Sequence, residues 1–360
     1  MPTREPGRQG RLKRADPSAP GIARRRVGRG FGYVDADGRR VTDADVLDRI
    51  RALVLPPAWT DVWICADPNG HIQAVGTDAA GRRQYRYHDV WRARRDLAKF
   101  DRVVGFARAL PDLRAQVSEH LGRADLDQER VLACAARLLD LGFFRIGGEG
   151  YASANQTFGL ATMRKSHVTL SGEVVRFDYV AKSGKRRVQS LADPDVIAVL
   201  TALKRRRGGG PELLAYRRGS TWVDVRSADI NGYLKDVTGG QYTAKDFRTW
   251  SATVLAAVAL AVSEEVTAPV ARRRAVTRAV CEVAHYLGNT PTVCRTSYID
   301  PRVVDRYLAG VTVKGALDRL GADTPFGSLS TQGPVEAAVL DLLDGAPGTA
   351  AAPAPLRRAG

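Results

Sequence analysis

The stretch LDQERVLACAARLLDLGF, residues 126–143, places apolar residues at helical spacing and predicts an amphipathic helix. The same spacing recurs in three further segments: FARALPDLRAQVSEHLG (106–122), DPDVIAVLTALKRR (193–206) and residues 227 to about 308. One β-patterned segment, VTLSGEVVRFDYVAKSGKRRVQS (168–190), interrupts them, with turn signals at Ser171–Gly172 and Ser183–Gly184. These patterns predict a mostly helical domain around one small sheet.

Residues 30 to about 103 carry shorter patterns, typical of β-strands and turns. GFGYVDADGRRV (30–41) suggests a hairpin around Asp37–Gly38, and a short helix is expected near residues 43–53. Further strands are expected in VWICADPNG (62–70), HIQAVGTD (71–78) and RRQYRYH (82–88). The predicted fold is therefore α+β, with a small β-rich N-terminal domain (30–103) and a mostly α-helical domain (104–326).

The two ends of the chain have a different composition from these domains. Residues 1–29 contain Arg24, Arg25 and Arg26 among scattered Pro and Gly, which indicates a basic flexible arm. Residues 327–360 contain one short helical pattern, VEAAVLDLLDG, followed by an Ala/Pro/Gly tail, so this end is expected to be largely disordered.

The net charge of the chain narrows the choice of partner. Lys and Arg number 55 against 39 Asp and Glu, which gives a formal charge of +16 and a pI near 10.1. An excess of this size favours association with polyanions, nucleic acid first. A basic surface without specific purpose and affinity for an acidic membrane surface are the alternatives. There is no apolar run of about 18 residues and no signal-peptide core, so we expect a cytoplasmic protein without a membrane span.

The cysteines and histidines do not suggest a metal site. Four cysteines and five histidines are scattered, with no C-x-x-C pair and none of the spacings typical of zinc ligands. No Walker-type G-x-x-x-x-G-K-[ST] loop is present either. We therefore expect a protein that works without a bound metal or other cofactor.

A polyanion partner raises the question of which residues could act on a phosphodiester. A tyrosine can attack phosphorus, but its free pKa near 10 leaves roughly one phenol in a thousand ionised at neutral pH, so nearby cations are needed. The negative charge that gathers on the phosphorus oxygens needs arginine or similar donors. The departing 5′ oxygen needs a proton, which lysine can give and arginine cannot readily give.

Five residues supply this set of groups: Arg145, Lys182, Arg248, Asn289 and Tyr298. Arg145 follows the helix at 126–143 in a glycine-rich string, and Lys182 lies at the tip of the probable hairpin. Each also has an ordinary explanation when taken alone. The arginines could be solvated cations, Lys182 a polar turn residue, Asn289 a helix C-cap after Gly288, and Tyr298 a half-buried aromatic.

The strings around these residues add a resemblance to a known family. They are FFRIGGEGYA (143–152), FGLATMRKSHV (158–168), YVAKSGK (179–185), AKDFRTW (244–250) and LGNTPTVCRTSYIDPRVV (287–304). Together and in this order they resemble the bacterial, poxvirus-like branch of the type IB DNA topoisomerases, from about residue 30 to residue 310.

The resemblance implies a role for each residue of the set. Tyr298 would be the nucleophile that forms a 3′-phosphotyrosyl link, and Lys182 would be the general acid for the 5′ oxygen. Arg145 and Arg248 would stabilise the transition state. Asn289 stands where the viral enzymes have a histidine, which keeps a hydrogen-bond donor but removes an ionisable group. The implied reaction relaxes supercoiled duplex DNA without ATP or metal.

The resemblance also implies contacts with DNA and a mode of action. QYRYHDVW (84–91) resembles a DNA-contacting segment of the viral enzymes, and the residues expected to contact DNA are Gln84, Tyr85, Tyr87, Tyr151 and Lys245. The enzyme would act as a monomer whose two domains clamp double-stranded DNA in the bacterial nucleoid. Two alternatives remain open at this point: a site-specific tyrosine recombinase, and a non-catalytic DNA-binding protein.

Overall fold

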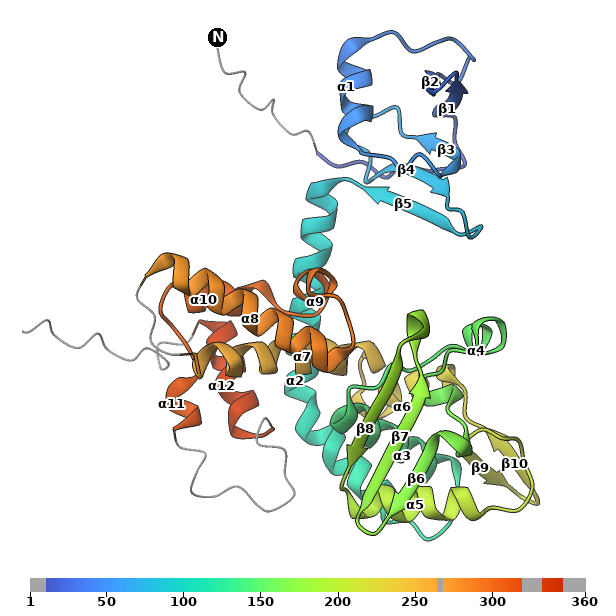
Figure 1. The fold of residues 1–360 in the computed structure, drawn as a ribbon, viewed down its shortest axis with the longest axis vertical. Coiled ribbons are helices and arrows are strands. Elements are labelled where there is room, and N and C mark those ends of the chain that lie inside the picture. The colour runs from blue at the N-terminus through green and yellow to red at the C-terminus, as the bar shows by residue number, and fades with distance from the viewer. Residues whose placement is uncertain (1–10, 264–267, 319–331, 346–360) are drawn as a thin grey trace, which may run out of the picture. The chain divides into compact units, whose positions relative to one another are not determined.

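The computed structural model describes three stretches of the chain: residues 11–263, 268–318 and 332–345. The chain divides into two compact units, Met1–Lys99 and Phe100–Gly360, each with a hydrophobic core of its own (Figure 1). The division falls a few residues before the expected boundary at residue 103. The predicted α+β fold, with a β-rich first part and a mostly helical second part, is confirmed.

The first unit is a five-stranded antiparallel sheet with one helix packed against it. The strand order is β2-β1-β3-β4-β5. The elements are β1 (Ile22–Val27), β2 (Gly30–Val34), α1 (Ala44–Ala52), β3 (Thr60–Ile64), β4 (Ile72–Thr77) and β5 (Arg83–Tyr87). Ile50 of α1 packs with Ile64 and Ala74 of the sheet, and all three are almost fully buried.

Strand β1 corrects the prediction of a flexible arm over residues 1–29, as far as these residues are described. It pairs with both β2 and β3. Ile22 is buried, and the guanidinium of Arg24 donates hydrogen bonds to the carbonyls of Pro56 and Trp59 at 3.1 and 2.6 Å. These contacts explain the order of a segment whose composition alone indicates mobility. Residues 1–10 lie outside the described part of the chain.

The expected hairpin around Asp37–Gly38 is only partly present. A turn forms there, with the amide of Gly38 donating to the carbonyl of Asp35 at 3.1 Å. The main partner of β2, however, is β1, which precedes it across a turn at Gly28. The sequence therefore predicts the turn at Asp37–Gly38, but not the strand β1 that precedes β2.

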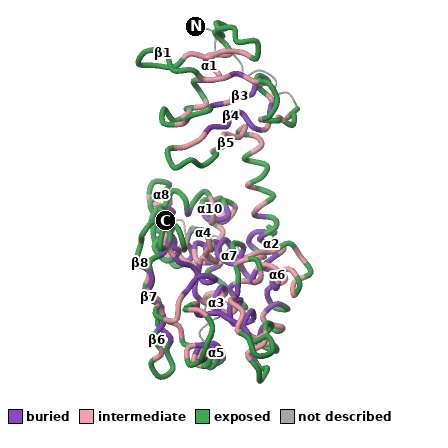
Figure 2. The backbone as a smooth tube through the Cα atoms, turned by 90° about the vertical axis from the view of Figure 1, so that its right-hand side faces the viewer, coloured by how far each residue is buried: buried purple, intermediate pink, exposed green. Residues whose placement is uncertain are grey.

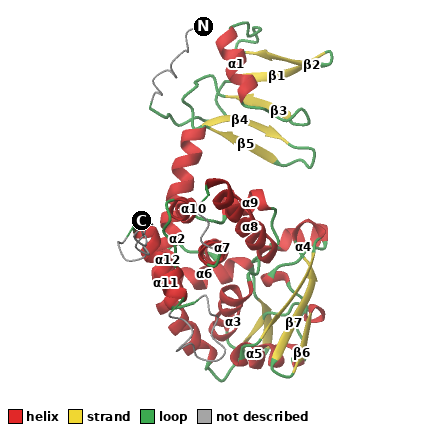
Figure 3. Cartoon of the chain, turned by 60° about the vertical axis from the view of Figure 1, so that its left-hand side comes forward, coloured by secondary structure: helices red, strands yellow, loops and turns green. Residues whose placement is uncertain are grey.

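The second unit is mostly helical, with a three-stranded antiparallel sheet and a separate two-stranded hairpin (Figure 3). The helices are α2 (Asp89–Leu121, which begins in the first unit), α3 (Gln128–Gly142), α4 (Glu149–Asn155), α5 (Pro194–Arg205), α6 (Ser227–Thr238), α7 (Ala244–Ala261), α8 (Pro269–Leu287), α9 (Pro291–Ser297), α10 (Pro301–Leu308), α11 (Lys314–Leu317) and α12 (Pro334–Asp344). The strands are β6 (Val168–Ser171), β7 (Val174–Val180), β8 (Arg186–Leu191), β9 (Ala215–Arg218) and β10 (Thr221–Asp224). Among the residues described, no helix is both long and apolar enough to cross a lipid bilayer.

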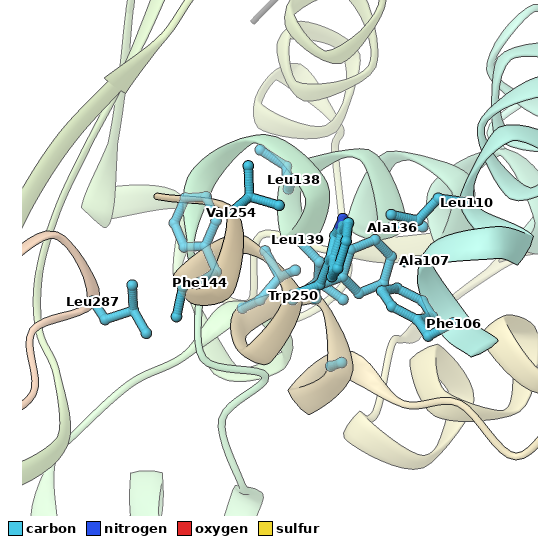
Figure 4. Packing of buried hydrophobic residues seen from close by; sticks show 14 of the residues in the cluster. Phe106, Ala107, Leu110, Ala136, Leu138, Leu139, Phe144, Trp250, Val254 and Leu287 are labelled. Carbon is cyan, nitrogen blue, oxygen red and sulfur yellow. The ribbon is translucent and has the colours of Figure 1, made fainter. Parts of the chain in front are cut away.

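Helix α7 lies in the core of this unit. Most of its residues are buried (Figure 2). The buried residues include Arg248 and Thr253, which have polar side chains. Figure 4 shows apolar side chains of α2, α3 and α7 in the same cluster, among them Phe106, Leu139 and Trp250. A helix so enclosed is held rigidly, because close packing leaves little room for it to shift.

Helix α12 lies in the described part of residues 327–360, for which the sequence predicts one short helix in a largely disordered tail. The helix itself is where the sequence predicts one, but its apolar residues Val335, Val339 and Leu342 are buried in the core of the second unit. Glu336 joins α12 to α2 and α7, because its carboxylate accepts hydrogen bonds from Arg114 at 2.6 Å and from the indole of Trp250 at 2.8 Å. Residues 346–360 lie outside the described part.

The contacts of Glu336 predict a measurable contribution to stability. Replacing Glu336 with Ala leaves the indole N–H of Trp250 without its acceptor and Arg114 with only Asp140, so we expect the free energy of unfolding to fall by about 2–3 kcal/mol. Urea denaturation measures this value.

The matched control is Asp344→Ala, because Asp344 of the same helix pairs with Arg108 at 2.6 Å but both side chains are largely exposed. Its effect should stay within about 0.5 kcal/mol. Equal effects of the two substitutions would contradict a structural role for Glu336.

Candidate active site

Arg248 is a buried arginine in the first turns of α7. The helix begins after Thr243, whose backbone N–H and hydroxyl both donate to the carboxylate of Asp246, at 2.8 and 2.9 Å, and this local pattern fixes the start of the helix. The Arg248 guanidinium donates to the carbonyls of Phe143 and, at 2.9 Å, Leu287. These carbonyls lie at the C-terminal ends of α3 and α8, where a cation is favoured.

Arg145 approaches the same place from the loop after α3. Its guanidinium donates to the carbonyl of Gly288 at 3.3 Å and to the side-chain oxygen of Asn289. The loop is held by contact with a second segment, since a Cβ on Gly159 would lie only 2.4 Å from the amide nitrogen of Gly147. Glycine is thus required here for close backbone packing, which places Arg145 beside the end of α8.

Asn289 combines a structural position with an unsatisfied donor. It follows Gly288, which has φ +63° and ends α8, and its backbone N–H donates to the carbonyl of Ala284 at 2.9 Å. Its side-chain oxygen accepts from Arg145, while its Nδ2 is buried and has no hydrogen-bond partner in the described part of the protein. The Nε of Arg248 is in the same situation. Two buried N–H donors therefore lie ready for an acceptor at this site.

Tyr298 completes the group at the end of α9. Its backbone amide donates to the carbonyl of Cys294 at 2.9 Å, and its ring lies 5.3 Å from the Arg248 guanidinium carbon. Burial by itself would raise the pKa of the Tyr298 phenol, but the positive charges of Arg248 and Arg145 outweigh it and lower the pKa below its ordinary value. Burial, together with the charge of Arg145, lowers the pKa of Arg248 to about 10.

Lys182 is the member of the predicted set that does not join the others. It lies at the tip of the β7–β8 hairpin, in the short 3-10 turn Lys182–Gly184, and its side chain is exposed. Among the described residues it makes no hydrogen bond or ion pair with the other four members, Arg145, Arg248, Asn289 and Tyr298. The structure thus brings four of the five predicted residues together and leaves Lys182 apart.

Arg187, on the same hairpin, is a site neighbour that the sequence reasoning missed. Its guanidinium donates to the carbonyl of Tyr286 at 2.8 Å, which ties β8 to the C-terminal end of α8. The spacing of Arg187 and Gln189 in the sequence could have indicated this, because residues two apart in a strand share one face. Gln189, on that same face of β8, donates to the carbonyl of Gly142 at 2.9 Å.

The predicted DNA contacts divide between the two units. On β5, Tyr85 and Tyr87 stack with ring centroids 6.0 Å apart, and Tyr85 is exposed. Gln84 points to the other face and donates to Asp78 at 2.8 Å, so the three predicted residues do not share one face. Lys245 is exposed in the first turn of α7, and its charge contributes to the lowered pKa of Tyr298. Tyr151 falls in α4, and its side chain is outside the described part.

Comparison with known proteins gives family matches over both units. Residues 88–313 match the model of the eukaryotic DNA topoisomerase I catalytic core, and residues 30–78 match that of the bacterial DNA topoisomerase IB N-terminal domain. DNA topoisomerase 1B of Acanthamoeba polyphaga mimivirus is 30% identical over 80% of this chain and 87% of its own length. DNA topoisomerase 1B of vaccinia virus (strain Copenhagen) is 28% identical over 30% of this chain and 34% of its own, and DNA topoisomerase 1 of Schizosaccharomyces pombe is 28% identical over 44% and 19%.

The charges around Tyr298 predict a shift that titration can detect. Replacing Arg145 with Gln removes one of the positive charges that lower the pKa of Tyr298, so we expect this pKa to rise. The measurement is the ultraviolet phenolate titration of the variant, from which the titration of the same variant carrying Tyr298→Phe is subtracted.

A matched control is Arg295→Gln, which removes an exposed arginine of α9. It should leave the pKa of Tyr298 near the wild-type value. An unchanged pKa in Arg145→Gln would show that Arg145 does not act on the phenol.

Proposed function

This chain belongs to the type IB DNA topoisomerase family, and from this premise we propose that it relaxes supercoiled duplex DNA through a transient 3′-phosphotyrosyl link to Tyr298. The observation that carries the proposal is the contact of Tyr298 with Arg248, close to Arg145. A half-buried phenol near two cations is suited to become a nucleophile, because the cations stabilise its charged form.

In the proposed cleavage step the Tyr298 oxygen attacks the phosphorus of one strand. The phenol gives up its proton to solvent, a bond forms between its oxygen and phosphorus, and the bond from phosphorus to the 5′ oxygen breaks. The 5′ oxygen gains a proton and leaves as a hydroxyl. Rotation of the free 5′ end releases torsion, and attack by the 5′ hydroxyl reverses the step. Each step exchanges one phosphodiester for another, so neither ATP nor a metal is required by the chemistry.

Arg145, Arg248 and Asn289 would stabilise the charge that develops on the nonbridging oxygens. Arg248 Nε and Asn289 Nδ2 are buried donors without a partner among the described residues, and a phosphodiester oxygen would supply the missing acceptor. Asn289 has no proton to exchange near neutral pH, so its proposed role is hydrogen bonding alone.

Lys182 is proposed as the general acid for the 5′ oxygen. Its ammonium group is a suitable proton donor, whereas the guanidinium groups of Arg145 and Arg248 already donate their hydrogen bonds to backbone carbonyls. Because Lys182 is exposed on the hairpin tip and separate from the other four, this role requires that DNA binding bring the tip and the scissile phosphate together.

The binding partner is proposed to be double-stranded DNA, bound by a monomer in the bacterial cytoplasm. The formal charge of +16 supports strong attraction to phosphates, and log affinity should fall by about 0.9 per unit of log salt concentration for each phosphate neutralised. The stacked pair of exposed Tyr85 and half-buried Tyr87 supports a DNA contact in the first unit, and Lys245 supports one beside the site.

The first prediction from this function concerns the nucleophile. Wild-type protein should relax a supercoiled plasmid in EDTA without ATP, whereas Tyr298→Phe, which removes only the attacking oxygen, should bind DNA but not relax it. Agarose electrophoresis measures relaxation, and a gel-shift assay measures binding. Relaxation by Tyr298→Phe at the wild-type rate would show that another residue is the nucleophile, and recombination without relaxation would favour a site-specific recombinase.

The second prediction concerns the arginines. Arg145→Ala and Arg248→Ala should each slow single-turnover cleavage at saturating DNA by at least about 10²-fold, by analogy with the loss of an oxyanion donor. Arg295→Ala serves as a control for the loss of an exposed arginine on α9. Thermal unfolding must accompany the Arg248 measurement, because this side chain also joins the ends of α3 and α8. Cleavage at the wild-type rate would remove the substituted arginine from the mechanism.

A further inference from the structure

Thr253 is a buried hydroxyl residue of α7 that none of the roles above uses. It lies five residues after Arg248 and is 1% exposed. Its hydroxyl oxygen accepts a hydrogen bond from the backbone N–H of Asp300 at 3.1 Å. Its single proton has two carbonyl acceptors within reach, Thr249 at 2.9 Å in its own helix and Tyr298 at 3.3 Å.

These contacts fall on both sides of a short link between two helices. Helix α9 ends at Ser297 and α10 begins at Pro301, so Tyr298, Ile299 and Asp300 form the whole link. Tyr298 has non-helical backbone angles, φ −130° and ψ −29°. Its backbone amide is still bonded to the carbonyl of Cys294 in α9, whereas its carbonyl accepts from the Thr253 hydroxyl of α7. The Thr253 hydroxyl meets the carbonyl at the start of this link and the amide at its end.

We propose that Thr253 is a positioning residue that fixes the backbone of Tyr298 relative to Arg248. Both are anchored to α7, Arg248 as a residue of the helix and Tyr298 through the Thr253 hydroxyl. A buried, regular helix keeps these two anchor points at a constant separation. The link is also held at its far end, where Asp300, 2% exposed, caps α10 and pairs with Arg302 at 2.7 Å.

The hydroxyl has a role here that an apolar side chain of the same shape cannot fill. Without it the buried Asp300 N–H has no acceptor in the described part of the structure, and the link can regain a hydrogen bond only by moving. Displacement of a nucleophile by about 1 Å can cost about 10²-fold in rate. Thr277 of α8, by contrast, bonds within its own helix, where its hydroxyl donates to the carbonyl of Arg273 at 3.1 Å.

The test compares Thr253→Val, which keeps the shape and removes the hydroxyl, with Thr253→Ser, which keeps the hydroxyl. The probe is a duplex with a short 5′ leaving strand that dissociates after cleavage, used at saturating protein under single-turnover conditions. We expect Thr253→Val to slow adduct formation by about tenfold or more, with the Kd for the same duplex unchanged, and Thr253→Ser to stay within about threefold of wild type. Thr277→Val is the matched control and should cleave like wild type.

The inference rests on the proposed function, and the outcomes separate the two. Absence of an adduct with wild type would overturn the proposed function itself. If wild type is active, a normal cleavage rate in Thr253→Val would overturn the positioning role alone. An equal loss of rate in Thr253→Val and Thr253→Ser would also overturn it, because the hydroxyl would then not be what matters. The positioning role would also be overturned if a rise in Kd, or a fall in the unfolding temperature, accounted for the whole loss of rate in Thr253→Val. A residue needed only for stability would behave in this way.

Discussion

The arrangement of the site depends on one buried cation, the guanidinium of Arg248. Its charge is tolerated in the core because the C-terminal carbonyls of α3 and α8 accept its hydrogen bonds. The same two helix ends continue into Arg145 and Asn289, so the contacts that satisfy Arg248 also determine where those side chains lie. Tyr298 packs over this guanidinium. The lowered pKa of Tyr298 therefore follows from the way in which the core accommodates the charge of Arg248.

Much of this arrangement could be predicted from the sequence, and the misses have identifiable causes. Helical spacing gave the main helices, and the strings around Arg145, Arg248, Asn289 and Tyr298 indicated four residues that the fold brings together. The contact of Glu336 with Trp250 was not predictable, because the two are 86 residues apart and no local pattern connects them. Strand β1 was missed because Arg24, in a basic and Gly-containing segment, finds its acceptors in a loop more than thirty residues away.

The ordinary and the functional explanations of a residue turn out to be compatible in this chain. Asn289 does cap the end of α8, as its position after Gly288 suggests, and its side chain still presents a buried donor to the site. Arg248 joins two helices and also shifts the pKa of Tyr298. Lys182 shows the reverse case, because it has the expected turn position but no contact with the other four residues that would reveal its proposed function.

The central claim is that Tyr298 is the residue that becomes joined to DNA. The most direct test is to stop wild-type protein with denaturant during reaction with a duplex, digest the trapped adduct with nuclease and protease, and locate the nucleotide by peptide mass spectrometry. The account predicts a nucleotide attached through its 3′ phosphate to the peptide that contains Tyr298, at the tyrosine itself. A nucleotide on another residue, or a 5′ linkage, would contradict it.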